Sequence, residues 1–234
     1  MKNVAILLAG GTGSRFGEKL PKQFLPLSDG RSLLQTCIDT FLSCDLIDDI
    51  WVVMHRDWIQ AVPSSVHAIE GGKERWESSY NAIQAVSRHY QEDVNVWIHD
   101  VARPFVGQTI LQQVGDALAR YEAVSVAVPV TDTIYQVRPS TCDVTVQSIP
   151  LRSTMMRAQT PQAFRLSLIK TAFDLALSDP DGIHATDDAG IVLHYLPDTL
   201  IHIVAGDETN RKITFRNDIP RQKQLGVRCC SASG

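Results

Sequence analysis

Short apolar runs that alternate with amphipathic segments dominate the first 130 residues of this chain. The runs are rich in Val and Ile, which is typical of buried strands, and the segments between them place apolar residues at helical spacing. A strand, helix, strand order indicates a parallel sheet with helices on both faces and the carboxyl ends of the strands along one edge. We therefore expect an α/β fold, a Rossmann-like doubly wound and mostly parallel sheet, with strands at residues 4–9, 50–54, 66–69, 94–98 and 123–128 and helices at 33–42, 78–86 and 110–118.

The pattern changes after Pro129, where apolar and polar residues alternate around a Pro-Ser-Thr turn. This alternation predicts a two-stranded hairpin, which does not insert easily into a parallel sheet, so residues 131–152 are expected to project as a β-hairpin arm. The remaining patterns predict helices at 166–177 and 187–195 and strands at 200–204 and 212–215.

One domain is expected from residue 1 to residue 226, with a disordered tail at 227–234. No signal peptide is recognised at the start of the chain, and the five cysteines form no Cys-x-x-Cys pair. An odd number of cysteines without a secretion signal favours reduced thiols and a cytoplasmic location.

The net charge of −4 at pH 7 excludes a general attraction to nucleic acid or to an anionic membrane. Cations that gather locally therefore stand out. Such a group follows the first strand, where glycines at positions 10, 11, 13 and 17 are accompanied by Arg15, Lys19 and Lys22. Glycines let backbone N–H groups approach a phosphate closely, so a triphosphate site is indicated, although a dinucleotide loop or a flexible turn stays open.

Leu-Ala-Gly-Gly-Thr-Gly-Ser-Arg at 8–15, followed by Leu-Pro-Lys-Gln-Phe-Leu at 20–25, resembles the signature of nucleotidyltransferases that activate sugar or polyol phosphates. The Pro-Lys-Gln form resembles, more narrowly, the 2-C-methyl-D-erythritol 4-phosphate cytidylyltransferase family and its close relatives, the ribitol-5-phosphate cytidylyltransferases. The resemblance runs from residue 4 to about residue 218. It implies an enzyme that uses CTP and Mg²⁺, with the catalytic residues Arg15, Lys22, Arg152 and Lys212.

Two further segments match the family at expected strand ends. Gly-Gly-Lys-Glu-Arg at 71–75, with Ser78, resembles the pattern that holds the cytosine, although a plain strand-to-helix turn is an alternative. Asp100 follows the fourth strand as a candidate Mg²⁺ ligand, with an ion pair to Arg103 as the alternative, and His99 is interpreted as a structural core residue. The family has Ala where this chain has Val101. The CTP-binding residues implied are Leu8, Ala9, Gly10, Gly11, Thr12, Gly13, Gly72, Lys73, Arg75, Ser78, Asp100 and Val101.

In the resembling enzymes the arm crosses to a second subunit, which implies a homodimer with shared active sites. Arg152 could instead be an exposed strand-end cation, Thr186 a helix N-cap, and Lys212 a lysine on an edge strand. The acceptor-binding residues implied by the resemblance are Arg103, Thr133, Arg152, Thr160, Thr186 and Lys212.

Methylerythritol phosphate is the expected acceptor of CMP, and ribitol 5-phosphate is the alternative. Residues 102–104 and 128–133 look closer to the first kind of enzyme, whereas residues 55–58 and 10–13 look at least as much like the second. A non-catalytic nucleotide-binding module is the alternative from another class. A dinucleotide-dependent oxidoreductase needs an acidic residue after the second strand, where Met54-His55-Arg56 stands instead.

Overall fold

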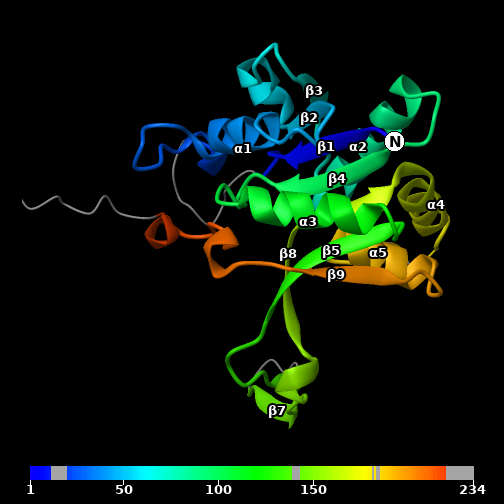
Figure 1. The fold of residues 1–234 in the computed structure, drawn as a ribbon. Coiled ribbons are helices and arrows are strands. Elements are labelled where there is room, and N and C mark those ends of the chain that lie inside the picture. The colour runs from blue at the N-terminus through cyan, green and yellow to red at the C-terminus, as the bar shows by residue number, and fades with distance from the viewer. Residues whose placement is uncertain (12–19, 139–142, 181, 183–184, 220–234) are drawn as a thin grey trace, which may run out of the picture.

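A seven-stranded sheet forms the centre of the molecule, in the order β3-β2-β1-β4-β8-β5-β9 (Figure 1). The computed structural model describes residues 1–11, 20–138, 143–180, 182 and 185–219. Every neighbouring pair is parallel except the two that β8 makes, which confirms the predicted, mostly parallel sheet. The strands are β1 (Asn3–Leu8), β2 (Asp49–Met54), β3 (His67–Glu70), β4 (Asn95–Asp100), β5 (Ala123–Pro129), β8 (Met156–Arg165) and β9 (Ile201–Ala205).

Helices cover both faces of this sheet, as the doubly wound prediction requires. Ala5 and Leu7 of β1 pack in one apolar cluster with α1 (Leu33–Leu42) and α3 (Gln108–Leu118). Val4 and Ile6 point the other way, into a cluster with the remaining helices, because successive side chains of a strand alternate between faces. Those helices are α2 (Arg75–His89), α4 (Leu166–Leu177) and α5 (Asp188–Tyr195).

The predicted arm is confirmed as a separate antiparallel pair, β6 (Gln136–Arg138) and β7 (Thr145–Ser148). The 3₁₀ helix η4 (Arg152–Thr154) follows it and leads into β8. Figure 1 shows the arm projecting well away from the sheet.

Two elements differ from the sequence-based expectation. β8 was not predicted because glutamines and a proline interrupt its apolar pattern, yet Gln159 and Gln162 are buried between β4 and β5. The strand expected at 212–215 is absent from the described backbone. The N–H groups of Thr214 and Phe215 donate instead to the Asp218 carboxylate, in a turn that closes on η6 (Arg216–Asp218).

No described helix combines the length needed to cross a bilayer with a sufficiently apolar sequence.

Candidate active site

The carboxyl ends of β1 and β4 lie side by side in the middle of the sheet. Leu8 and Asp100 are register partners, and the N–H of Val101 donates to Leu8 O at 3.1 Å. The chain continues from β1 to β2 on one side of β1, whereas β4 lies on its other side. Such a reversal of strand order opens a crevice at the carboxyl ends, where α/β proteins bind ligands.

The glycine-rich segment starts at this crevice. Ala9 is buried, and its N–H donates to Val53 O at 2.8 Å, which directs Gly10 and Gly11 past the strand ends. Three of the predicted residues, Thr12, Gly13 and Arg15, lie outside the described part of the chain.

Asp100 carries a carboxylate that two cations share. Its Oδ2 lies 2.6 Å from Lys212 Nζ, and its Oδ1 lies 3.2 Å from Arg75 Nε. Burial alone raises the pKa of the Asp100 carboxyl, but the charges of Arg75 and Lys212 outweigh it and hold that pKa below its ordinary value. The carboxyl group is therefore ionised at neutral pH. Its ion-pair partners in the described part of the chain are Arg75 and Lys212, so the alternative of an Asp100–Arg103 ion pair is wrong.

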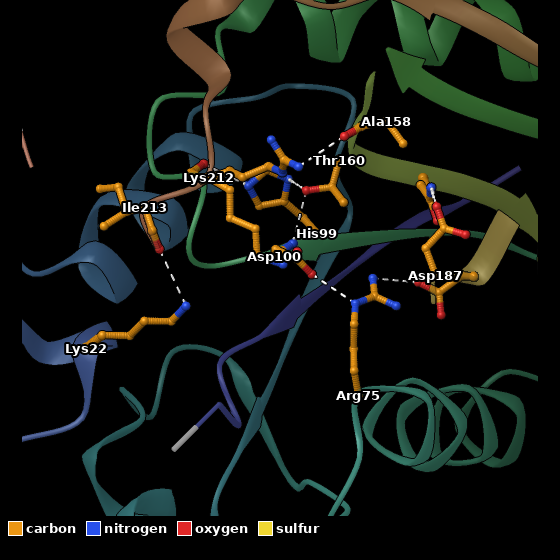
Figure 2. Close-up of polar contacts among 12 residues, drawn as sticks. Lys22, Arg75, His99, Asp100, Ala158, Thr160, Asp187, Lys212 and Ile213 are labelled. Atoms are coloured by element: carbon orange, nitrogen blue, oxygen red, sulfur yellow. Dashed lines mark hydrogen bonds and ion pairs between the residues drawn. The ribbon is translucent and has the colours of Figure 1, made fainter. Parts of the chain in front are cut away.

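The cations at this edge come from segments far apart in the sequence. Arg75 is the first residue of α2, and Lys212 follows the 3₁₀ helix η5 (Glu208–Asn210). Lys22 opens the 3₁₀ helix η2 (Lys22–Phe24), and its Nζ donates to the carbonyl of Ile213 at 3.5 Å. Figure 2 shows Arg75 and Lys212 on two sides of Asp100, with Lys22 ending beside Ile213. Fixed cations grouped in this way suit an anionic ligand.

A buried hydrogen-bond chain supports Asp100 from behind. The N–H of Asp100 donates to Thr160 Oγ1 at 3.1 Å, so the Thr160 hydroxyl donates its own hydrogen to His99 Nδ1 at 3.0 Å. His99 is then neutral and donates from Nε2 to Arg103 O at 3.0 Å. Burial lowers the pKa of His99 to about 4, which agrees with the neutral ring and with its predicted structural role.

The side chains of Arg103 and Thr160 make hydrogen bonds within the protein that hold Asp100 and its neighbours in place. The Arg103 guanidinium donates to the carbonyls of Asn210 at 2.9 Å and Ala158 at 3.1 Å, and so ties η5 to β8. Thr160 is buried with its hydroxyl fully used. In this structure both side chains hold the site together, and their predicted contact with the acceptor stays a prediction.

The Gly-Gly turn before α2 is fixed by its own helix. Gly72 N donates to Ser78 Oγ at 3.1 Å, and Ser78 Oγ donates to Glu74 O at 3.2 Å. The two groups expected to read a base therefore contact each other in this structure. A Cβ on Gly72 would lie 2.1 Å from Glu77 Cβ, so only glycine fits there. Lys73 also belongs to the turn, through its N–H and the Glu77 carboxylate.

Thr186 lies close to Arg75, across a cavity of about 220 Å³ that residues 74–76 and 185–187 line. The alternative of Thr186 as N-cap is wrong, because Asp187 caps α5 and accepts from Gly190 N at 2.9 Å. A larger hollow of about 640 Å³ at residues 120–122 and 195–200 has none of the predicted site residues in its wall.

Arg152 and Thr133 are not brought to the Asp100 group. Both are exposed on the arm, and Arg152 Nη1 donates to Thr131 O at 3.0 Å. Among the described residues no hydrogen bond or ion pair joins either side chain to Asp100, Arg75 or Lys212.

Two buried residues of the site were missed from the sequence. Asp188 is fully buried, with Arg75 Nη2 at 2.8 Å from its Oδ2. Asn210 is also fully buried and donates from Nδ2 to Gln159 Oε1 and Thr160 O. An acid in the first turn of a helix and an Asn at the end of a short 3₁₀ helix are both common by pattern, so no sequence signal distinguished them.

Asp100, which the sequence predicts as a metal ligand, lies at the centre of the site between Arg75 and Lys212. No group of three or more His, Cys, Asp or Glu side chains suited to a metal ion occurs in the described ranges. A single carboxylate beside several cations fits a metal that takes most of its other ligands from phosphates and water, which is the habit of Mg²⁺.

Comparisons with known proteins agree with this geometry. The family model described as 2-C-methyl-D-erythritol 4-phosphate cytidylyltransferase matches residues 3–225. An enzyme of that name from Bifidobacterium longum subsp. infantis is 38% identical, over 95% of this chain and 79% of its own length. A bifunctional ribulose 5-phosphate reductase/CDP-ribitol pyrophosphorylase from Haemophilus influenzae is 37% identical, over 93% of this chain and 47% of its own length.

Solved structures agree as well. The crystal structure of the Francisella tularensis 2-C-methyl-D-erythritol 4-phosphate cytidylyltransferase superposes with a TM-score of 0.79 at 26% identity, covering 94% of this chain and 97% of that one. The family model matches nearly the whole chain, including every strand and helix that builds the Asp100 edge. The chain belongs to the 2-C-methyl-D-erythritol 4-phosphate cytidylyltransferase family.

Proposed function

We propose that this enzyme transfers CMP from CTP to 2-C-methyl-D-erythritol 4-phosphate and releases pyrophosphate. The observation that carries the proposal is the pairing of Asp100 with Arg75 and Lys212 at the switch point of the sheet, with Lys22 nearby against the Ile213 carbonyl. Family membership makes the chain a CTP-dependent nucleotidyltransferase, so the alternative of a non-catalytic module falls away.

The nucleotide side of the site is assigned to the carboxyl ends of β1 and β4 and to the turn before α2. Backbone groups of the glycine-rich segment would face the phosphates, and Arg15 and Lys22 would supply their charge. The turn at 71–78 would hold the cytosine once the Gly72–Ser78 contact opens. The CTP contacts proposed are Leu8, Ala9, Gly10, Gly11, Thr12, Gly13, Gly72, Lys73, Arg75, Ser78, Asp100 and Val101.

The reaction is a single in-line displacement. An oxygen of the acceptor phosphate bonds to the α-phosphorus of CTP as the bond to the β-phosphate oxygen breaks, and pyrophosphate departs. A phosphate monoester is already an anionic nucleophile, so neither a covalent intermediate nor a strong base is needed. The task of the protein is to hold two anions in line and to stabilise the charge on the equatorial oxygens, for which Lys22 and Lys212 are suited.

The Asp100 carboxylate would hold a divalent cation together with the triphosphate. Mg²⁺ bound there would offset negative charge on the phosphates. Lys212 lies on Asp100 Oδ2, and its half-exposed side chain is free to leave that oxygen for a phosphate.

The acceptor side is proposed to form between two copies of the chain, with residues 131–152 as the dimerisation arm of one domain that spans residues 1–226. The support is an apolar surface of the hairpin that the described residues of the same chain leave exposed. Arg152 and Thr133 would reach the site of the second copy, opposite its Lys212 and Thr186. The exposed apolar residues of the arm are Ile134, Tyr135, Val137, Val144, Val146, Ile149 and Leu151.

Mixing two inactive variants tests the shared site. Lys22→Ala and Arg152→Ala each disable both sites of their own homodimer. After subunit exchange, each mixed dimer has one site with both defects and one with neither. About a quarter of wild-type activity is expected to return in an equimolar mixture. A mixture that stays as inactive as its components would contradict the shared site.

Acceptor choice is tested by pyrophosphate release from CTP and Mg²⁺ with methylerythritol phosphate and ribitol 5-phosphate side by side. We expect at least tenfold higher kcat/KM for methylerythritol phosphate. Ribitol 5-phosphate is the second candidate because of the Haemophilus influenzae relative, and a preference for it would overturn the proposed acceptor. A cytoplasmic location belongs to the same proposal, with the free buried thiols of Cys37 and Cys44 as support.

A further inference from the structure

Four charged side chains of alternating sign run through the site in a row. Lys212 Nζ lies 2.6 Å from Asp100 Oδ2, Asp100 Oδ1 lies 3.2 Å from Arg75 Nε, and Arg75 Nη2 lies 2.8 Å from Asp188 Oδ2. The first three of them are seen in Figure 2. They come from the loop after η5, the end of β4, and the starts of α2 and α5, so the row joins four separate segments.

Asp188 is the end of this row that no solvent reaches. Its side chain is 0% exposed, against 43% for the side chain of Lys212 at the other end. Within the described residues, Arg75 is the one cation in ion-pair distance of Asp188, and apart from that contact neither carboxylate oxygen has a hydrogen-bond partner there. A buried carboxylate left without a cation is strongly unfavourable, so Asp188 commits one edge of the Arg75 guanidinium to itself.

The ion pair with Asp188 limits the number of hydrogen bonds that Arg75 makes to Asp100. An arginine that faces a carboxylate without competition makes two parallel N–H···O bonds, one to each oxygen. Here Arg75 reaches Asp100 with Nε alone, because Nη2 is held by Asp188. The second oxygen of Asp100 is left to Lys212, a single charge on a flexible and half-exposed stem.

We propose that Asp188 is a positioning residue that keeps Arg75 from closing on both oxygens of Asp100, and so leaves one oxygen for a divalent cation. The inference rests on the proposed role of Asp100 as metal ligand. Without the Asp188 charge, Arg75 turns Nη2 to Asp100 and competes with the cation for its second oxygen.

The test compares Asp188→Asn with Asp187→Asn, which is its matched control. Both changes remove one negative charge from adjacent residues of the same helix start. Asp187 caps α5 and accepts from Gln162 Nε2 at 2.8 Å, and its carboxylate is not among the ion-pair partners of Arg75. Binding of Mn²⁺ is measured by the loss of the free-ion electron paramagnetic resonance signal, with CTP at tenfold its dissociation constant for each protein.

For Asp188→Asn we expect the Mn²⁺ dissociation constant to rise about tenfold, the effect of one added charge-assisted contact to Asp100. CTP binding without metal is expected to change less than twofold. Asp187→Asn keeps a side-chain oxygen for the cap but loses the acceptor of Gln162 Nε2, so it is expected to lower the Tm modestly and to leave Mn²⁺ binding within twofold of wild type. Equal weakening in both variants, or a Mn²⁺ constant for Asp188→Asn within twofold of wild type, overturns the proposal.

A double variant separates the proposed effect from damage to the fold. In Asp188→Asn/Arg75→Gln no buried charge is left unpaired and no guanidinium competes for Asp100, so Mn²⁺ binding is expected to return at least to the wild-type constant. Binding as weak as in Asp188→Asn alone overturns the proposal, and this comparison holds even where the single variant folds poorly. Pyrophosphate release by the wild-type enzyme is measured separately, so a failure of the proposed function is seen apart from a failure of the Asp188 inference.

Discussion

The Asp100 edge of the sheet and the arm at 131–152 differ in where their side chains find partners. At the sheet edge, His99, Thr160 and Asn210 are buried polar residues, and each is hydrogen-bonded to the same chain. On the arm, Ile149 is 60% exposed and Leu151 70% exposed. The first region buries polar side chains that find partners within the chain, whereas the second keeps an apolar surface in solvent.

A single chain can therefore build one half of the site by itself. Buried hydrogen bonds fix the geometry of Asp100 and its cations before any ligand arrives, as preorganised electrostatic stabilisation requires. The exposed apolar side chains of the arm are instead suited to contact with a second copy, because such patches mark interfaces. We therefore expect changes at the sheet edge to act within one chain and changes on the arm to act through association.

The largest effect is expected for a variant at the sheet edge, where the loss of one cation should lower turnover. Lys212→Met is expected to lower kcat about 10² to 10³-fold, because it removes a cation aimed at charge that develops in the reaction. The Tm is expected to change little, since the Lys212 side chain is 43% exposed and Asp100 keeps Arg75. Steady-state pyrophosphate release and thermal unfolding are the measurements.

Lys170→Met is the matched control for that variant. Lys170 forms a surface ion pair with Asp174 at the same 2.6 Å distance within α4, and neither residue contacts Asp100 or Arg75 through a described ion pair. Its loss is expected to leave turnover unchanged and to cost less than about 1 kcal/mol of stability. A similar fall in turnover for both lysines would mean that Lys212 acts through general charge and not through its position.

The second effect concerns the buried support of Asp100 and depends on pH. The pKa of His99 is lowered from 6.5 to about 4 by burial, so between these values the unfolded chain binds a proton that the folded chain does not. The free energy of unfolding is therefore expected to fall as the pH decreases from 6.5 to 4, by about 3 kcal/mol in total from this group. The Asp100 pKa is also lowered, and its loss of stabilisation begins only below 3.8.

Urea unfolding of wild type and His99→Gln across pH 7 to 4.5 measures this slope. The variant has no imidazole to titrate, so its curve is expected to be flatter over that range although it is less stable at pH 7. Parallel curves for the two proteins would show that His99 is not the titrating group.

The sequence predicted most of the fold but only part of the site, because local patterns reveal buried faces and do not reveal contacts between distant segments. Val- and Ile-rich runs and helical spacing predicted the parallel strands and the five α-helices of the described ranges, because a buried face leaves a periodic apolar pattern. Gln159 and Gln162 concealed β8, since the partners that permit their burial lie elsewhere in the chain. Asp188 carried no signal because its meaning depends on Arg75, more than 100 residues earlier. Motifs at strand ends located Asp100 and Lys212, but their distance to each other is a property of the folded chain.

The smallest expected effect compares the two regions with one and the same substitution. Val124 in β5 is fully buried, and Val146 in β7 is 52% exposed. Val124→Ala removes two methyl groups from the core and leaves a cavity, so the free energy of unfolding is expected to fall by about 2–3 kcal/mol. Val146→Ala is expected to stay within about 0.5 kcal/mol when measured at dilutions where sedimentation shows single chains.

Protein concentration then separates the two valines. If the arm packs against a second copy, the Tm of the wild type rises with concentration, and Val146→Ala loses part of that rise because it weakens association. Val124→Ala is expected to keep the whole rise from a lower starting point, since its defect lies inside one chain. A cost for Val146→Ala equal to that of Val124→Ala in the dilute protein would mean that the arm folds onto its own domain, and the contrast between the two regions would then be wrong.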